Sequence, residues 1–266
     1  MNAPKLGIRW TIGDVRERGF VALRLSITGA RRLFGADASY VVYVNSIPVE
    51  RAREKTGAVP AEVRWQASPA SAPEWLRARL GATMADGVAW KLLPVRSFPD
   101  RFELALDNDV VLWSEPPALR AWLKDGRRCL LAADVRPAFG AFSVECGARP
   151  LNTGIRGLPP GYDLEARLSA MLDRHPRRLD SELDEQGMQV AALLPDEPLV
   201  VSLADVTICS PFPPHLEELG THGAHFVGIN TQKLPFSLYD GRPSELVRAE
   251  HFDHHLPRVL ERLGAS

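Results

Sequence analysis

Short apolar runs alternate with segments of helical spacing along the first half of the chain. Apolar runs that predict strands cover residues 6–12, 40–44, 63–66, 102–106 and 129–133. Between them, helix signals are expected over residues 14–34, 48–57, 73–80 and 116–123. This alternation is typical of a mainly parallel sheet with helices on both faces. The pattern therefore predicts an α/β fold with a central sheet flanked by helices.

The first predicted helix carries start and stop signals. Asp14 can act as its N-cap, and Glu17, three residues on, would complete a capping box. Apolar residues follow at helical spacing, and Gly35 suits the position after the last turn. We therefore expect the helix to begin directly after Asp14 and to end before Gly35.

The second half of the chain is less regular. Residues 147–161 are rich in Gly and Pro, a strand is expected at 199–203, and helices are expected over 164–172, 184–194 and 244–263. Pro257 predicts an interruption in the last helix, because proline lacks the backbone N–H that a helix interior uses. No internal repeat or long linker divides the sequence, so a single domain over residues 1–266 is the simplest interpretation.

Composition narrows the class of protein. The 266 residues are 45% hydrophobic and 24% charged, with a formal net charge of −1. This balance supports a sizeable core and argues against a disordered chain and a dedicated nucleic-acid binder. No apolar run has the ~20 residues of a membrane span, and the first residues lack a signal-peptide core. Three scattered cysteines without a CxxC pair favour a reducing, cytoplasmic location.

The strongest chemical signal follows the predicted strand at 102–106. Asp107 and Asp109, separated by one residue, stand directly after this apolar run. Ligands of α/β sheets bind beyond the carboxyl ends of the strands, and carboxylate oxygens suit Mg²⁺ or Mn²⁺. Such an ion could neutralise a diphosphate. An ordinary acidic turn after a strand is the alternative interpretation.

The segment from Trp90 to Asp109 resembles the centre of the GT-A-fold nucleotide-sugar glycosyltransferases. In that fold a cation precedes the Asp-x-Asp motif by about the interval that separates Lys91 from Asp107. The resemblance implies that Lys91 contacts the sugar-nucleotide donor and that Asn108, between the two aspartates, belongs to the donor site. A solvated surface lysine is the alternative interpretation of Lys91.

Two further segments extend the resemblance in the family's order. Residues 151–157 contain Asn152-Thr-Gly154, which looks like the strand that lines the sugar and acceptor pocket. Residues 183–187 contain Asp184-Glu185-Gln186, which resembles the segment that opens a helix beside the transferred sugar. The carboxylates could hold sugar hydroxyls or act as a base. Acidic residues are also typical of any helix N-terminus, so a capping role stays open.

The segment His225-Phe-Val-Gly228-Ile-Asn-Thr-Gln-Lys233 is similar to the His-x-x-Gly-x-x-Lys-Pro segment of the family 8-like retaining enzymes. The resemblance implies that His225 is the third metal ligand, that Gly228 lets the backbone approach the diphosphate, and that Lys233 neutralises it. Two extra residues separate the glycine from the lysine here. His222 is a competing ligand.

The beginning of the chain fits a nucleotide site. The carboxyl ends of the first two predicted strands supply Thr11 and Asn45, where a base and ribose would bind. The family resemblance thus implies a nucleotide-binding half at residues 1–112 and an acceptor and sugar half at residues 113–266. No glycine-rich dinucleotide fingerprint or P-loop is present in the sequence.

These signals favour a metal-dependent glycosyltransferase that uses Mn²⁺ or Mg²⁺ and a nucleoside-diphosphate sugar, with a UDP-sugar preferred. The acceptor is unknown, and no nucleic-acid partner is expected. One alternative is a haloacid-dehalogenase-like phosphatase, whose Asp-x-Asp nucleophile motif normally lies near the N-terminus. Another is a non-catalytic sugar-nucleotide-binding protein.

The last predicted helix carries a separate histidine cluster. His251 lies three and four residues before His254 and His255. Histidines at this spacing share a helix face and can bind zinc, although a solvated helix is the simpler interpretation.

Overall fold

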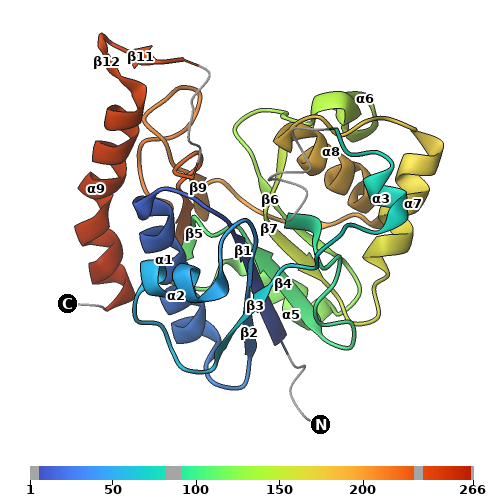
Figure 1. The fold of residues 1–266 in the computed structure, drawn as a ribbon, viewed down its shortest axis with the longest axis horizontal. Helices are drawn as coiled ribbons and strands as arrows, with labels where there is room; N and C mark the ends of the chain where they lie inside the picture. The colour runs from blue at the N-terminus through green and yellow to red at the C-terminus, as the bar shows by residue number, and fades with distance from the viewer. Residues whose placement is uncertain (1–5, 82–90, 231–235, 265–266) are drawn as a thin grey trace.

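The centre of the molecule is a seven-stranded sheet (Figure 1). The structure is a computed structural model that describes residues 6–81, 91–230 and 236–264. The strands of this sheet are β1 (Leu6–Ile12), β2 (Ser39–Val44), β3 (Val63–Ala67), β4 (Phe102–Leu106), β6 (Leu130–Ala133), β7 (Leu151–Leu158) and β8 (Leu199–Val201). They lie in the order β3-β2-β1-β4-β7-β6-β8.

Most neighbours in the sheet run parallel. β1 pairs in parallel with β2 and β4, β2 with β3, and β6 with β8, whereas β7 is antiparallel to β4 and β6. The predicted α/β class with a mainly parallel sheet is therefore confirmed, with β7 making the sheet mixed. Because β2, β1 and β4 are parallel neighbours, their carboxyl ends meet at one edge of the sheet.

A three-stranded sheet extends this edge. It contains β5 (Val110–Leu112), β9 (Val206–Ile208) and β10 (Gly223–His225), with β10 in the middle. β10 is antiparallel to β5 and parallel to β9. The short hairpin of β11 (Leu238–Tyr239) and β12 (Arg242–Pro243) precedes the last helix.

Helices cover the sheet in two groups. Figure 1 shows α1, α2 and α9 together on one side and α3, α6, α7 and α8 together on the other. One buried apolar cluster joins the sheet to α1 and α5, and another surrounds α7 and α8. The bounds are α1 (Glu17–Phe34), α2 (Val49–Thr56), α3 (Glu74–Arg77), α5 (Pro117–Asp125), α6 (Ser143–Cys146), α7 (Leu164–Arg174), α8 (Glu182–Leu193) and α9 (Ser244–Leu263), with 3₁₀ turns η2 (Gly140–Phe142) and η3 (Leu194–Asp196).

The expected start of α1 is wrong. The helix begins at Glu17 with Arg16 at the N-cap, so Asp14 lies outside it. The residues before the helix form a turn instead, in which Val15 N–H donates to the Gly13 carbonyl at 3.0 Å. The Asp14 carboxylate lies 3.4 Å from Lys55 Nζ on α2.

The expected interruption of α9 is also wrong. The helix runs without a break from Ser244 to Leu263, with Pro257 inside it. Phe252 before the proline and Val259 after it are both buried in the same apolar cluster. Packing on both sides of the proline therefore outweighs the missing backbone hydrogen bond. Among the residues that the structure describes, no helix is long and apolar enough to cross a membrane.

Candidate active site and metal centre

Three potential metal ligands meet where the two sheets join. Asp107 and Asp109 lie in the turn between β4 and β5, which is closed by Val110 N–H donating to the Asp107 carbonyl at 3.0 Å. β10 ends at His225, which pairs with Val110 of β5. Phe226 N–H then donates to the Asp109 carbonyl at 2.9 Å. This pairing brings His225 beside the two aspartates from more than a hundred residues away.

The ligand atoms of this Asp107–Asp109–His225 cluster all lie within 4.8 Å of one another. His225 Nε2 is 3.2 Å from Asp109 Oδ1 and 3.8 Å from Asp107 Oδ2. Asp109 Oδ1 is buried and makes no well-aligned hydrogen bond within the described part of the chain; its close partner there is His225 Nε2. A buried carboxylate oxygen is costly unless its charge is compensated. Two carboxylates and an imidazole fit Mn²⁺ or Mg²⁺, and a cation would satisfy this oxygen.

Nearby charged side chains shift the pKa values of His225, Asp107 and Lys91. Burial alone would lower the pKa of His225, but the adjacent Asp109 and Asp107 raise it overall. Burial alone would raise the pKa of Asp107, but Lys91 and His225 hold it below its usual value. Lys91 Nζ lies 2.8 Å from Asp107 Oδ2. Against the lowering effect of burial, the nearby carboxylates raise the pKa of Lys91. In the absence of a metal ion, Lys91 and His225 therefore supply the positive charge beside Asp107 and Asp109. A bound metal ion would take over this role.

Two amides fix the other side of the Asp-x-Asp turn. Asn108 and Asn230 exchange hydrogen bonds of 2.9 Å, and Asn230 Nδ2 also donates to Asp109 Oδ2 at 3.0 Å. Asn108 Nδ2 reaches the Gly19 carbonyl of α1 at 3.2 Å. These contacts give Asn108 a positioning role, while its predicted contact with a donor stays a prediction.

β7 lies against the cluster through Gly154. A Cβ at Gly154 would lie 2.6 Å from His225 Cε1 and 2.7 Å from Asn152 Oδ1. Gly154 N–H donates to Asn152 Oδ1 at 2.6 Å, and Asn152 Nδ2 donates to Asp134 Oδ2 at 3.1 Å. Asn152 and Gly154 are therefore brought to the site, as the sequence predicts. Asp134 was not predicted, although an acidic residue directly after the strand expected at 129–133 was a readable signal.

The three residues at the start of α8 have different surroundings. Asp184 closes a capping box with Ser181 and also accepts from Ala141 N–H at 2.7 Å. Gln186 Nε2 donates to the Ala138 carbonyl at 2.9 Å. Glu185 instead lines a hollow of about 30 Å³ together with Lys91 and Asp107.

Glu185 is the titratable group of α8 nearest to the cluster. Burial raises its pKa to about 7, with Asp107 adding to the shift and Lys91 and Arg156 opposing it. Its carboxylate accepts a hydrogen bond from Gln189, whose own side-chain oxygen accepts one from Arg156. A carboxyl group that titrates near neutral pH can take or release a proton during a reaction.

A buried charge network beneath the site was missed at the sequence level. Arg9 and Arg156 lie 3.8 and 3.9 Å from Glu103 Oε1. Glu103 Oε2 accepts hydrogen bonds from the backbone of Ser97 and Phe98 at 2.6 and 2.8 Å. Charged residues in the middle of apolar strands β1, β4 and β7 were the only signal. Arg9 and Arg156 of this network line the same hollow as Glu185.

The remaining predicted residues lie farther along the same edge or outside the described residues. Thr11 lines the small hollow with Asp107. Asn45 follows β2, and its Oδ1 accepts from Ser46 Oγ at 2.9 Å. Gly228 has a left-handed φ of 80°, and its carbonyl accepts a hydrogen bond from Arg248. Lys233 lies outside the residues that the structure describes.

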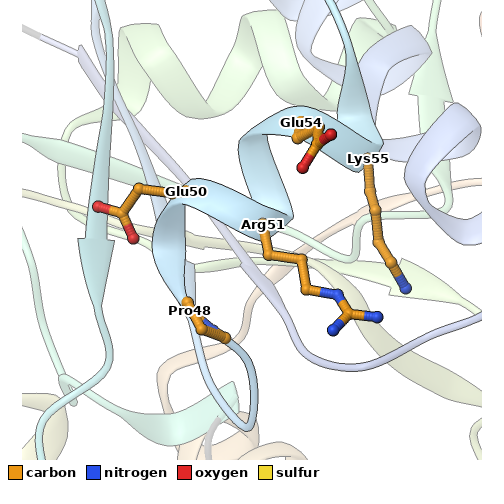
Figure 2. A pocket seen from close by; sticks show the side chains of 5 residues that line it. All are labelled: Pro48, Glu50, Arg51, Glu54 and Lys55. Atoms are coloured by element: carbon orange, nitrogen blue, oxygen red, sulfur yellow. The ribbon is translucent and has the colours of Figure 1, made fainter.

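Two alternatives to this site are weaker. His222 does not join the cluster, because its Nδ1 contacts Ser114 Oγ at 2.8 Å and its Nε2 lies 3.6 Å from Asp205 Oδ1. A larger hollow of about 750 Å³ lies along α2 (Figure 2). No residue of the Asp107–Asp109–His225 cluster lines this hollow. Its lining residues are Pro48, Glu50, Arg51, Glu54 and Lys55.

Comparison with known proteins decides the fold. No protein-family model matches the sequence, and no curated protein matches it. The structure matches galactosyltransferase LgtC in complex with donor and acceptor sugar analogues, with a TM-score of 0.53 and 12% identity over 97% of this chain and 95% of that chain. The fold is GT-A-like.

Two other GT-A-like matches support this assignment. Mouse xyloside xylosyltransferase 1 matches with a TM-score of 0.52 and 13% identity over 87% of this chain and 99% of that chain. The bifunctional glycosyltransferase WbbM matches with a TM-score of 0.52 and 13% identity over 97% of this chain and 52% of that chain. The predicted resemblance to family 8-like glycosyltransferases is therefore confirmed at the level of the fold.

Proposed function

We propose that this chain is a metal-dependent glycosyltransferase that uses a nucleoside-diphosphate sugar, with a UDP-sugar as the favoured donor. The observation that carries the proposal is the convergence of the ligand atoms of Asp107, Asp109 and His225 within 4.8 Å of one another. This cluster lies at the carboxyl end of β4 in a GT-A-like fold. Donors of this class carry a diphosphate, which such a cluster can hold through a divalent cation.

The cationic side chains would act on the donor phosphates. Asp107, Asp109 and His225 would hold Mn²⁺ or Mg²⁺, which would supply positive charge for the donor diphosphate and the leaving nucleotide. Lys91, now paired with Asp107, is 42% exposed and can turn toward a phosphate when a cation takes its place. Lys233 is proposed for the same task, and Gly228 for close backbone approach. Thr11 and Asn45 are proposed for the base and ribose.

The opposite side of the site would bind the sugar and the acceptor. Asn152 is held by Asp134, and Gln186 by the Ala138 carbonyl, so both amides have fixed positions for sugar hydroxyls. Glu185, with a pKa raised to about 7 mainly by burial, is the best candidate on α8 to exchange a proton. In this scheme residues 1–112 bind the nucleotide and residues 113–266 bind the sugar and the acceptor. No observation favours the phosphatase alternative.

The test is metal-dependent release of UDP from UDP-sugars. The chelator-treated protein is incubated with UDP-galactose, UDP-glucose or UDP-xylose, with and without Mn²⁺, and free UDP is measured. We expect release from one donor only when Mn²⁺ is present, with water accepting the sugar in place of the unknown acceptor, and a loss of about 100-fold or more in Asp109→Asn. The surface variant Asp253→Asn, which removes an exposed pair with Arg18, is the control and should keep the rate. UDP binding without release from any donor would support the non-catalytic alternative and contradict the proposal.

A further inference from the structure

A second group of potential metal ligands lies between α9 and the three-stranded sheet. Cys209 directly follows β9, and His251 and His255 are one turn apart on α9. Their ligand atoms all lie within 4.8 Å of one another, and Cys209 and His255 are buried. Among the described residues, this group and the Asp107–Asp109–His225 cluster are the only sets of three or more potential ligands spaced this closely. The sequence singles out the histidines, but the contribution of Cys209 is visible only in the fold.

The spacing within this group is close to that of a zinc site. In tetrahedral sites with Zn–N of about 2.0 Å and Zn–S of about 2.3 Å, ligand atoms lie about 3.3–3.6 Å apart. The present atoms lie within 4.8 Å of one another, so zinc binding would draw them closer together. The rings of His251 and His255 are 4.7 Å apart at an interplanar angle of 74°, so both face the same region from one side of the helix.

A fourth donor atom is already present at this point. The Glu217 carbonyl accepts a hydrogen bond from Cys209 Sγ at 3.6 Å and lies 3.2 Å from His251 Nε2. The ring nitrogen of His255 belongs to the same group, because it lies within 4.8 Å of the Cys209 and His251 ligand atoms. Sulfur, two nitrogens and one oxygen thus surround a single point.

We propose that Cys209, His251 and His255 bind a zinc ion, with the Glu217 carbonyl as the fourth ligand. A thiolate and two imidazoles form a borderline-soft ligand set that selects Zn²⁺ over Mg²⁺ or Mn²⁺. The oxygen-rich Asp107–Asp109–His225 cluster has the opposite preference. The two sites would therefore hold different ions in one chain.

The zinc ion would clamp α9 to the sheet that carries His225. Cys209 N–H donates a hydrogen bond to the His225 carbonyl at 2.7 Å. The backbone of the proposed zinc ligand Cys209 is therefore hydrogen-bonded to that of His225, the proposed ligand of Mn²⁺ or Mg²⁺. Phe226, next to His225, packs edge-to-face on Phe252 of α9 at 5.0 Å. The zinc site thus has a structural role, and its occupancy does not depend on the proposed glycosyltransferase activity.

Cobalt provides a direct probe of the thiolate ligand. The full chain is treated with a chelator, dialysed and titrated with Co²⁺, and its near-ultraviolet absorption is recorded. We expect a thiolate-to-cobalt charge-transfer band that saturates at about one equivalent and disappears when Zn²⁺ is added. We also expect saturating Zn²⁺ to raise the Tm by roughly 5 °C or more.

Matched variants separate this site from the rest of the chain. Cys209→Ser and His251→Ala should both lose the band and the Tm rise, and the half-buried His251 keeps the test valid if Cys209→Ser does not fold. Cys146→Ala, at another buried cysteine, and His254→Ala, at the exposed neighbour, should keep both. Asp109→Asn should also keep both while losing the Mn²⁺-dependent UDP release. A band that persists in Cys209→Ser, or no band and no Tm rise in the unmodified chain, would overturn the proposal.

Discussion

At the scale of single residues, the two oxygens of Asp109 have different tasks. Oδ2 is fixed by Asn230 Nδ2 at 3.0 Å, whereas Oδ1 is 3.2 Å from His225 Nε2 and makes no well-aligned hydrogen bond within the described residues. One oxygen therefore sets the orientation of the carboxylate and the other remains available to a cation. A fixed carboxylate loses little conformational freedom when it binds metal, which favours affinity.

Gly154 should control the position of His225. A methyl group at Gly154→Ala would lie 2.6 Å from His225 Cε1, so the imidazole must move. We expect Mn²⁺ affinity, measured by calorimetry, to fall at least about tenfold, with a stability loss of about 1–3 kcal/mol. Gly157→Ala on the same strand, whose Cβ would lie 2.7 Å from Trp122 Cε2, is the matched control. It should lose comparable stability and keep its Mn²⁺ affinity; equal losses of affinity in both variants would contradict the assignment.

Glu185 should make the metal-free protein less stable as pH rises. Burial raises its folded-state pKa to about 7 from its usual value of 4.5, so between these values the unfolded chain releases a proton that the folded chain keeps. Stability is therefore lost from about pH 4.5 to pH 7, by up to about 3 kcal/mol. Urea unfolding should show that the stability of Glu185→Gln relative to the unmodified chain increases as pH rises over this range. The exposed Glu50→Gln should run parallel to the unmodified chain, and parallel behaviour of Glu185→Gln would be evidence against a buried, protonated Glu185.

The chemistry at the carboxyl ends of the strands could be anticipated at this scale, but the charge network within the sheet could not. Asp107, Asp109 and His225 were predicted from motif and order, and the fold brings them together. Arg9 and Glu103 were not predicted as partners, because they lie in different strands that become neighbours only through the β1–β4 pairing. The contact between Arg9 and Glu103 depends on the register in which β1 pairs with β4, and the apolar pattern of each strand does not specify that register.

At the scale of elements, two neighbouring carboxylates in the first turn of α8 have different roles: Asp184 caps the helix, and Glu185 lines the candidate site. Asp184 accepts hydrogen bonds from the backbone of Asp180 and Ser181, both at 2.9 Å, and from Ala141. These bonds hold the pKa of Asp184 below its usual value even though burial alone would raise it. The next residue, Glu185, faces the hollow beside Asp107.

Asp184 should matter for stability more than for turnover. Asp184→Asn removes acceptor capacity from the capping box, and we expect a loss of about 1–2 kcal/mol in the free energy of unfolding. UDP release per folded molecule should change only a few-fold. Asp163→Asn, at the side-chain N-cap of α7, is the control for a cap distant from the cluster. A loss of about 100-fold in the rate of a stable Asp184→Asn protein would favour the catalytic role that the sequence also allowed.

Element prediction succeeded for many strands and helices but missed the three-residue strands β5, β9 and β10. The strand at residues 102–106 and the helix at 164–172 were close to the observed β4 and α7. β5, β9 and β10 have three residues each, too few to show alternation, and they form only because they pair with one another. These short strands place His225, so the most important link of the site could not be read from local pattern.

At the scale of the whole molecule, one sheet joins the two predicted halves. β4, which belongs to residues 1–112, pairs with β7 along its length, and the small sheet pairs β5 with β10. The metal cluster lies where these pairings meet, so it needs segments from both halves. The single-domain interpretation stays a prediction that agrees with this pairing.

The central claim is that this meeting point binds a nucleoside diphosphate through a divalent cation. Isothermal titration calorimetry of UDP with the chelator-treated chain, with and without Mn²⁺, tests it most directly. We expect Mn²⁺ to tighten UDP binding by at least about tenfold, because the coupling requires both ligands to share one site. Asp109→Asn should abolish this tightening. An equal UDP affinity with and without Mn²⁺, or a tightening that persists in Asp109→Asn, would contradict the assignment of the metal centre.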